Sequence, residues 1–528
     1  MRALLLVALV ALIVGVAVAA SGGGGSAGGA APATGAATIV PADALAYVHL
    51  STDASRPGVK RALALAARFP DYPLLAAGLD ARLAALAPSG GGGISFARDI
   101  RPWLGKEAAL ALLDTGTSTA APLIVLDVSD RAGAQAFLSR IGAVRGSNYR
   151  GVQLFVRPGG ELAFVSHYLV LGADASVRAS IDVGAGHAPS LAGDSAYRAA
   201  AAGEPAGRVL DVYASAVGVR RLLVAQGGLA GALGVLLYQP ALTGVTMSVS
   251  ASPPGARIQI HRALDPTLAA IAGPPAKEFA PSLEAELPAG STLALDVNGL
   301  ARVAPRVLDA GATGGVGGAI GPLLSRLGAA LKAQGVDVAG LESIFSGETA
   351  VAVAPTSGHP SALVIVARAP NEAQARTELA ALEVPLAQLL ANASSSTGVE
   401  PAFTARTVDG VTAHQLPLAS GFELDYAVFR GLVVISTSLD GIGAVASHAH
   451  TLAGDPGYRA TLAGAPSRVT SLLFLDFSQL LSLAEQTGLT RGARFQALRS
   501  DLQKVGAVGL ASTSGEADST AELSLQIP

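Results

Sequence analysis

Short apolar stretches and polar turns alternate through most of the chain. Stretches rich in valine, leucine and isoleucine are separated by turns containing glycine, proline or asparagine, which is typical of short strands. Other segments, such as Leu323–Ala333, carry apolar residues three or four positions apart and predict amphipathic helices. The predicted strands come in adjacent pairs more often than in strict alternation with helices. This order favours an α+β fold with a largely antiparallel or mixed sheet and helices packed on one face of it.

The same pattern occurs twice along the chain. The phrase HAPSLAGDSAYRA at residues 187–199 returns as HAHTLAGDPGYRA at residues 448–460. Other matches follow in the same order, and each half closes with a predicted hairpin. These repeats predict two tandem homologous halves. Their bounds are residues 38–265 and residues 284–528, joined by a linker rich in proline and alanine at residues 266–283.

The N-terminal segment, residues 1–20, is apolar apart from Arg2 and ends in small residues. It predicts a signal peptide, but its apolar run nearly reaches the ~20 residues that span a bilayer, so a retained transmembrane anchor is the alternative. Residues 21–37 are rich in glycine and alanine and predict a flexible tether. We therefore expect an exported chain, either secreted or attached to the membrane by this segment, with its bulk outside the cytoplasm.

Composition excludes several classes of chemistry. The chain of 528 residues has no cysteine, which rules out disulfides, thiol catalysis and iron–sulfur clusters. Its net charge is -3, and basic residues do not cluster with aromatic ones. Nucleic-acid-binding domains usually present a basic face. We therefore expect no nucleic-acid partner.

The repeated phrase has the residues that begin and end a short helix. Asp194 and Asp455 stand at N-cap positions, and Pro456 follows at the first helical position, where proline is favoured. Three residues after each aspartate, a tyrosine can turn inward as an aromatic anchor. Gly203 and Gly464 follow each helix and predict its end. The phrase is thus explained as scaffold.

The histidines of the phrase raise a metal site as an alternative. His187 and His448 each follow a predicted helix, where an imidazole can hydrogen-bond to the last carbonyl groups. Metal binding would combine them with neighbouring histidine and aspartate side chains, but no HExxH-type spacing of ligands is present. We therefore predict no catalytic, cofactor or metal residue. The weak metal candidates are His187, His448, His450, Asp194 and Asp455.

Two glutamates also recur in the halves. Glu107 and Glu348 each precede a predicted strand, in the segments GKEAALALL and SGETAVAVA. A role as general acid is conceivable for such a residue. A charged residue at the edge of a strand is far commoner, and we expect that placement for both.

Taken together, these segments resemble a known family. The anchor-like N-terminus, the glycine-rich tether and the segments VPADALAYVHL, GKEAALALL and LAGDSAYRA are similar to domain-of-unknown-function family 3352. The resemblance implies a bacterial envelope protein with no assigned activity, and it implies no catalytic residues.

Function is therefore expected from organisation rather than from a motif. The main hypothesis is a non-enzymatic binding or assembly module of the envelope, acting on an envelope protein or an apolar ligand. A carrier or sensor of a lipid or other apolar molecule is the second hypothesis. An exported hydrolase is the third, although no nucleophile with a neighbouring base can be assembled from the sequence. No cofactor is expected.

Overall fold

The computed structural model describes residues 31–73, 77–78, 94–114, 116, 120–224, 237–272, 275–300, 344–356, 361–391, 402–419, 422–486 and 493–528. The predicted signal peptide or anchor, the first part of the tether and the helix predicted at Leu323–Ala333 lie outside these residues. No helix among the described residues has the length and apolar character needed to cross a membrane.

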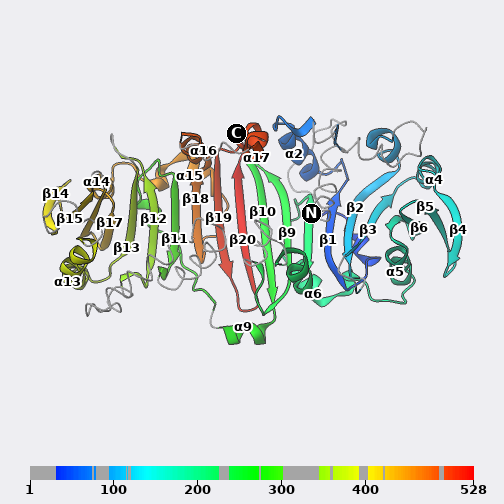
Figure 1. Ribbon diagram of the computed structural model, residues 1–528, viewed down its shortest axis with the longest axis horizontal. Helices are drawn as coiled ribbons and strands as arrows, with labels where there is room; N and C mark the ends of the chain where they lie inside the picture. The colour runs from blue at the N-terminus through cyan, green and yellow to red at the C-terminus, as the bar shows by residue number, and fades with distance from the viewer. Residues whose placement is uncertain are drawn as a thin grey trace.

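The described strands form one sheet of 20 strands (Figure 1). Every neighbouring pair is antiparallel. Across the N-terminal half the order is β4 (Val144–Tyr149), β5 (Val152–Arg157), β6 (Gly160–Val165), β7 (Tyr168–Gly172), β3 (Ala121–Val128), β2 (Leu104–Leu113), β1 (Ala44–Ser51), β8 (Leu210–Ser215), β9 (Leu242–Ser252) and β10 (Gly255–Leu264).

The C-terminal half continues the sheet with the corresponding order reversed. From the middle outward it runs β20 (Asp518–Gln526), β19 (Ala507–Ser514), β18 (Ser471–Asp476), β11 (Leu293–Asn298), β12 (Glu348–Ala354), β13 (Ala362–Arg368), β17 (Leu432–Ser436), β16 (Phe422–Phe429), β15 (Val411–Ala419) and β14 (Thr404–Val408). The last strand of each half therefore lies in the middle of the sheet.

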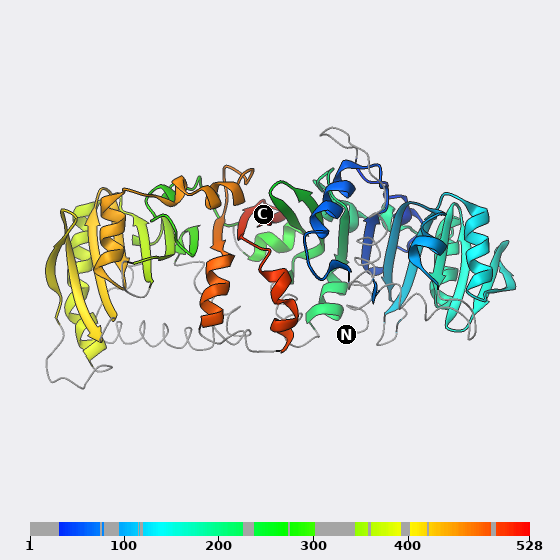
Figure 2. The ribbon, with the colours of Figure 1, turned by 90° about the horizontal axis from the view of Figure 1, so that it is seen from above.

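The two halves meet through strands β10 and β20. These strands pair from Gly255 opposite Gln526 to Ala263 opposite Asp518. Side chains reinforce the seam, since His261 Nδ1 lies 2.9 Å from Thr520 Oγ1 and Arg257 Nε lies 2.9 Å from Glu522 Oε1. Figure 2 shows the halves side by side along the long axis of the molecule. The α+β class is confirmed, and the sheet is antiparallel among the described strands.

Helices cover both faces at each end of the sheet, so the expectation of helices on one face is wrong. In the N-terminal half, α5 (Asp174–Gly184) packs on one face through Val177 and Ile181, and α4 (Arg131–Arg140) packs on the other through Phe137. The alternation of side chains along each strand separates these two cores, because it presents apolar residues to both faces. In the C-terminal half, α14 (Leu439–Ser447) and α13 (Glu372–Ala391) take the corresponding places.

The remaining described helices have at most ten residues each. They are α2 (Pro57–Ala66), α6 (Ser195–Ala200), α7 (Ala216–Val219), α9 (Pro266–Ala272), α15 (Pro456–Thr461), α16 (Phe477–Gln486) and α17 (Ala493–Leu502). Single turns complete the described elements: η1 (Gly35–Thr38), η2 (Phe96–Ile100), η3 (Leu191–Gly193), η4 (Arg220–Val224), η5 (Leu283–Ala285) and η6 (Leu452–Gly454).

The face that carries α4 and α13 is only half covered in the middle. There, nine neighbouring strands, from β8 to β13, each carry one aliphatic residue that lies directly opposite an aliphatic residue of the adjacent strand. Every one of these side chains is half-buried. We call this set the apolar row: Leu210, Val249, Ile258, Leu523, Leu510, Leu473, Leu295, Val351 and Ile365.

Both predicted connecting segments end inside the fold. Ala36 and Ala37, at the end of the predicted tether, are buried in η1. Phe279, near the end of the predicted linker, is buried and pairs with Val469. Small and apolar residues at these positions fill core space beside the sheet, so the folded part begins earlier than the composition of the segments suggests.

Candidate functional site

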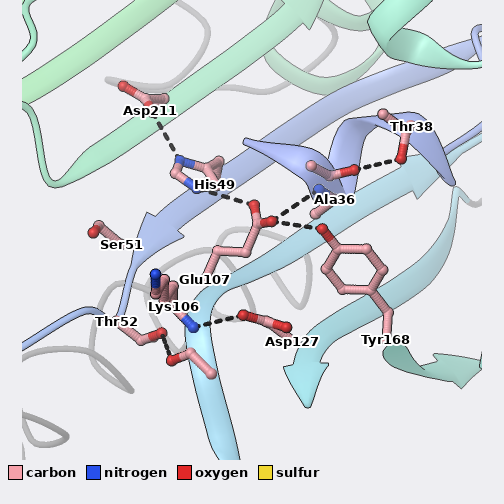
Figure 3. A network of polar contacts seen from close by, with 12 residues as sticks. Ala36, Thr38, His49, Ser51, Thr52, Lys106, Glu107, Asp127, Tyr168 and Asp211 are labelled. Carbon is pink, nitrogen blue, oxygen red and sulfur yellow. Dashed lines mark hydrogen bonds and ion pairs between the residues drawn. The ribbon is translucent and has the colours of Figure 1, made fainter. Parts of the chain in front are cut away.

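Among the described residues of the N-terminal half, a group of charged side chains is centred on His49 of β1. Its Nδ1 lies 2.8 Å from Asp211 Oδ2 on β8, and its Nε2 lies 3.4 Å from Glu107 Oε2 on β2 (Figure 3). Strand β1 lies between β2 and β8, and the register places Asp211 directly opposite His49. Glu107 lies opposite Ser51, two residues along β1 from His49. The three side chains therefore share a face, because residues opposite each other on paired strands and residues two apart on one strand point the same way.

The second oxygen of Glu107 is also occupied. Tyr168 donates its hydroxyl to Oε1 at 2.6 Å, and the backbone N–H of Ala36 donates to the same atom at 3.2 Å (Figure 3). Glycine at position 35 permits this approach, because a Cβ there would collide with the Tyr168 hydroxyl. The carboxylate therefore joins η1, β1, β2 and β7.

Partners, rather than solvent, determine the charges in this group. Burial alone would lower the pKa of His49, but its contacts with Asp211 and Glu107 outweigh burial and raise the pKa to about 9. Burial would raise the pKa of Glu107, whereas the contacts from His49 and Tyr168 outweigh it and lower the pKa. The imidazolium is therefore charged at neutral pH, between two carboxylates.

The alternation of charge extends beyond Asp211. Arg208 Nε lies 2.7 Å from Asp211 Oδ1, and Arg208 Nη2 lies 3.0 Å from Glu204 Oε2. Burial and the charge of Asp211 raise the pKa of Glu204 to about 7. We call Glu107, His49, Asp211, Arg208 and Glu204 the buried charge chain.

This chain is shielded from solvent at its centre. His49 is 1% exposed, Glu107 2% and Asp211 6%. General acid–base catalysis requires the proton-transferring group to come within hydrogen-bond reach of a substrate. The group connects β2, β1 and β8 by charge-assisted contacts.

The C-terminal half repeats the glutamate but changes its partners. Glu348, the counterpart of Glu107, accepts the backbone N–H groups of Ser282 and Leu283 at 2.5 and 3.0 Å, next to η5. Arg368 Nε lies 3.6 Å from its other oxygen. The place of His49 is taken by Asp296 of β11, which faces Leu472 where His49 faces Asp211.

An acidic cluster results from this change. Glu284, Asp296 and Glu348 each place one carboxylate oxygen within 4.8 Å of the others. Burial and the neighbouring Glu348 raise the pKa of Asp296 to about 9. Among the described residues, these three carboxylates form the group whose oxygens lie close enough to bind one metal ion jointly.

The five weak metal candidates from the sequence lie outside that cluster. His187 and His450 are exposed, and His448 follows α14 with its Nδ1 3.4 Å from Glu286 Oε2. Asp194 caps α6 by accepting the N–H of Tyr197 at 2.8 Å, and Asp455 caps α15 by accepting those of Gly457 and Tyr458. The helix-cap interpretation of both aspartates is confirmed, as is Pro456 at the start of α15.

Glu107 departs from the expected placement at the edge of a strand because it lies inside β2, whereas Glu348 is the first residue of β12, as expected. Glu107 is buried, and both carboxylates accept backbone N–H groups from the turn that precedes the first strand of their half. Sequence reasoning missed His49, Asp211 and Asp296 altogether. The available signal was a charged residue inside an otherwise apolar strand, as in LAYVHLS and LALDVN.

Comparison with known proteins places the chain in a family. A family described as "Protein of unknown function (DUF3352)" matches residues 3–527. The chain belongs to the DUF3352 family. The resemblance noted in the sequence is thereby confirmed, and no curated protein matches this DUF3352 chain.

Solved structures add little to that assignment. The match to "Structure of crystal form IV of TP0453" has 11% identity and a TM-score of 0.24, and covers 44% of this chain and 83% of the other. The match to "Structure of crystal form III of TP0453" has 10% identity and a TM-score of 0.26, and covers 47% and 90%. Likeness at this level supports no conclusion about function.

Proposed function

We propose that this DUF3352 protein is a non-enzymatic binding module of the bacterial cell envelope, and that its binding surface is the half-covered middle of the sheet. The apolar row carries this proposal. A soluble protein ordinarily buries such a set of aliphatic side chains, and contiguous accessible apolar surface usually marks an interaction site.

The row does not stand alone on its face. A second row of residues, paired directly across neighbouring strands, runs beside the apolar row. It includes Leu525, Val508, Leu475 and Leu293, and it ends at Leu363, which is 40% exposed. With strands ~4.8 Å apart, the nine strands of the row extend over roughly 38 Å. This surface suits an extended partner rather than a compact metabolite.

A groove at one side of the row adds a place for insertion. It has a volume of about 320 Å³ and lies between α2 and strands β9 and β10. Leu65 and Phe69 line one wall, and Val249 of the row and Ala256 line the other. Aliphatic and aromatic walls of this kind suit an apolar group.

The non-enzymatic part of the proposal is supported by the burial of the charges. Among the described residues, the buried charge chain brings together an imidazole and two carboxylates in the manner that catalysis requires, yet its central groups are enclosed. Their partners are strands of the same sheet, which supports a structural role.

The second candidate function is a carrier or sensor of a lipid or other apolar molecule. The groove beside Val249 favours it, because such a groove admits a chain or ring while the row supports the rest of the ligand. The two candidates differ in the occupant of the same face.

The expected location and duplication are parts of the same proposal. The N-terminal apolar segment supports export, with attachment to the membrane if it is retained. The mirrored strand order supports a duplicated ancestor, since each half uses its strands in the same sequence from the middle outward.

The test uses native mass spectrometry of the full chain extracted gently from its own envelope, followed by crosslinking. Leu473→Asn places an amide in the row, and Ser471→Asn on the same strand and face is the matched control. A co-purified apolar molecule that is lost in Leu473→Asn and kept in the control supports the carrier. A protein crosslink with the same pattern supports the assembly module. Unchanged binding in both variants, or an enzymatic turnover, contradicts the proposal.

A further inference from the structure

Asp296 is the least satisfied charged residue of the acidic cluster. It is only 5% exposed, and neither of its carboxylate oxygens has a hydrogen-bond partner. Oε2 of Glu284, which belongs to the same cluster, is also buried without a partner. Burying unpaired charge is costly, so a carboxylate in such a place requires a proton or a cation.

The N-terminal half shows which charge is missing. There, the corresponding position on the first strand holds His49, whose imidazolium lies between Glu107 and Asp211. In the C-terminal half, Asp296 replaces that cation while Glu348 remains, and Glu284 is added. The internal cation has been exchanged for two further acids.

The nearest basic group balances only part of this charge. Arg368 reaches Glu348 at 3.6 Å, and its Nη2 donates to Ser282 Oγ at 2.8 Å. It also approaches Glu286 at 4.0 Å, which is shared with Arg430 and His448. No contact between Arg368 and the oxygens of Asp296 is present among the described side chains.

We propose that Glu284, Asp296 and Glu348 bind a calcium ion, which supplies the positive charge that His49 supplies in the N-terminal half. Calcium takes oxygen ligands at 2.3–2.6 Å, so ligand atoms on opposite sides of it are ~4.8 Å apart, and the three carboxylate oxygens lie within 4.8 Å of one another. Magnesium usually uses one or two carboxylates and keeps several waters, and zinc prefers nitrogen and sulfur ligands.

Ion binding accounts for the unpartnered oxygens of the cluster. It supplies a partner for both Asp296 and Glu284, and it leaves the hydrogen bonds of Glu348 with Ser282 and Leu283 in place. It also links η5, β11 and β12, as Glu107 links η1 to β1 and β2.

The competing explanation is a proton shared between Asp296 and Glu348. Isothermal titration calorimetry of the chelator-treated full chain with CaCl₂, and with MgCl₂ as comparison, separates the two. Asp296→Asn keeps the shape of the protonated side chain, and Glu284→Gln alters a more accessible ligand. The matched control is Asp425→Asn on β16, since Asp425 is also buried with both oxygens unpartnered but lies outside the cluster.

We expect one calcium ion per chain and tighter binding of calcium than of magnesium. Asp296→Asn and Glu284→Gln should each weaken calcium binding at least about tenfold. Loss of a residue that only supports a ligand already weakens metal binding by about tenfold or more, and these residues are ligands themselves. Asp425→Asn should bind as the unaltered chain does, and calcium should raise the melting temperature of both. Absence of calcium binding at millimolar concentration, or equal binding by Asp296→Asn, overturns the proposal and leaves the shared proton.

Discussion

The two halves use one backbone plan to enclose different charges. Their strands run in the same sequence from the seam between β10 and β20, and in each half a glutamate on the second strand accepts backbone N–H groups from a preceding turn. In the N-terminal half, His49 then balances Glu107 and Asp211. In the C-terminal half, Asp296 adds to the negative charge of Glu348.

Backbone hydrogen bonds to the glutamate are common to both halves, whereas the side chain that faces the glutamate differs between them. Backbone donors at η1 and η5 hold the carboxylates of Glu107 and Glu348 in both halves. The neighbouring strand then supplies either a cation or another acid. We therefore expect the stability of the N-terminal half to depend on its own side chains, and that of the C-terminal half to depend on solutes.

Removal of the imidazolium should have the largest effect. His49→Leu leaves Glu107 and Asp211 buried without their shared cation, and breaking a buried ion pair in this way costs about 3–5 kcal/mol. Urea unfolding followed by circular dichroism should show a lower unfolding midpoint for the variant. A change below about 1 kcal/mol would contradict the structural role of the buried charge chain.

The second prediction concerns pH. The folded pKa of His49 is raised to about 9 from its ordinary value of 6.5, so its stabilisation is complete below pH 6.5 and is lost as pH rises through 9. The difference corresponds to about 3 kcal/mol. Unfolding free energy measured from pH 6 to pH 10 should fall accordingly. His49→Gln serves as the reference, because Glu204 and Asp296, whose pKa values are raised to about 7 and about 9, also contribute less to folding stability as pH rises.

A smaller effect is expected for Tyr168→Phe. The variant removes the hydroxyl that donates to Glu107 Oε1 and keeps the ring in the core. Hydrogen bonds to charged groups contribute about 1.5–3 kcal/mol, and the loss should lie at the lower end because Ala36 still donates to the same oxygen. Thermal unfolding of the variant checks this. A neutral result would show that the backbone donor alone satisfies Glu107.

Removal of the two helix caps should give the smallest losses of stability, and the two losses should follow a defined order. Asp194→Ala and Asp455→Ala each remove an N-cap, which usually costs about 1 kcal/mol. Asp455 accepts two backbone N–H groups and Asp194 accepts one, so Asp455→Ala should be the more destabilising. Denaturant midpoints of the two variants provide the measurement, and the reverse order would contradict the comparison.

Local chemistry was predictable from the sequence. Aspartate at the N-cap and proline at the first helical position determine where α15 begins, because both act on the backbone within one turn. The glycines at 203 and 464 adopt positive φ angles of 79° and 87°, as expected at the end of each helix. The alternation of apolar stretches and turns predicted the α+β class for the same reason, because this signal also depends only on residues close together in the sequence.

Only the tertiary structure decided the partners of charged residues and strands. Nothing local to β10 indicates that it pairs with β20, which lies more than 250 residues further along the chain. His49 and Asp296 occupy equivalent strands, but their surroundings come from residues far away in sequence, such as Asp211 and Glu348. Whether a buried charge is balanced depends on these distant neighbours, because Coulomb interactions act through space and strengthen as water is excluded.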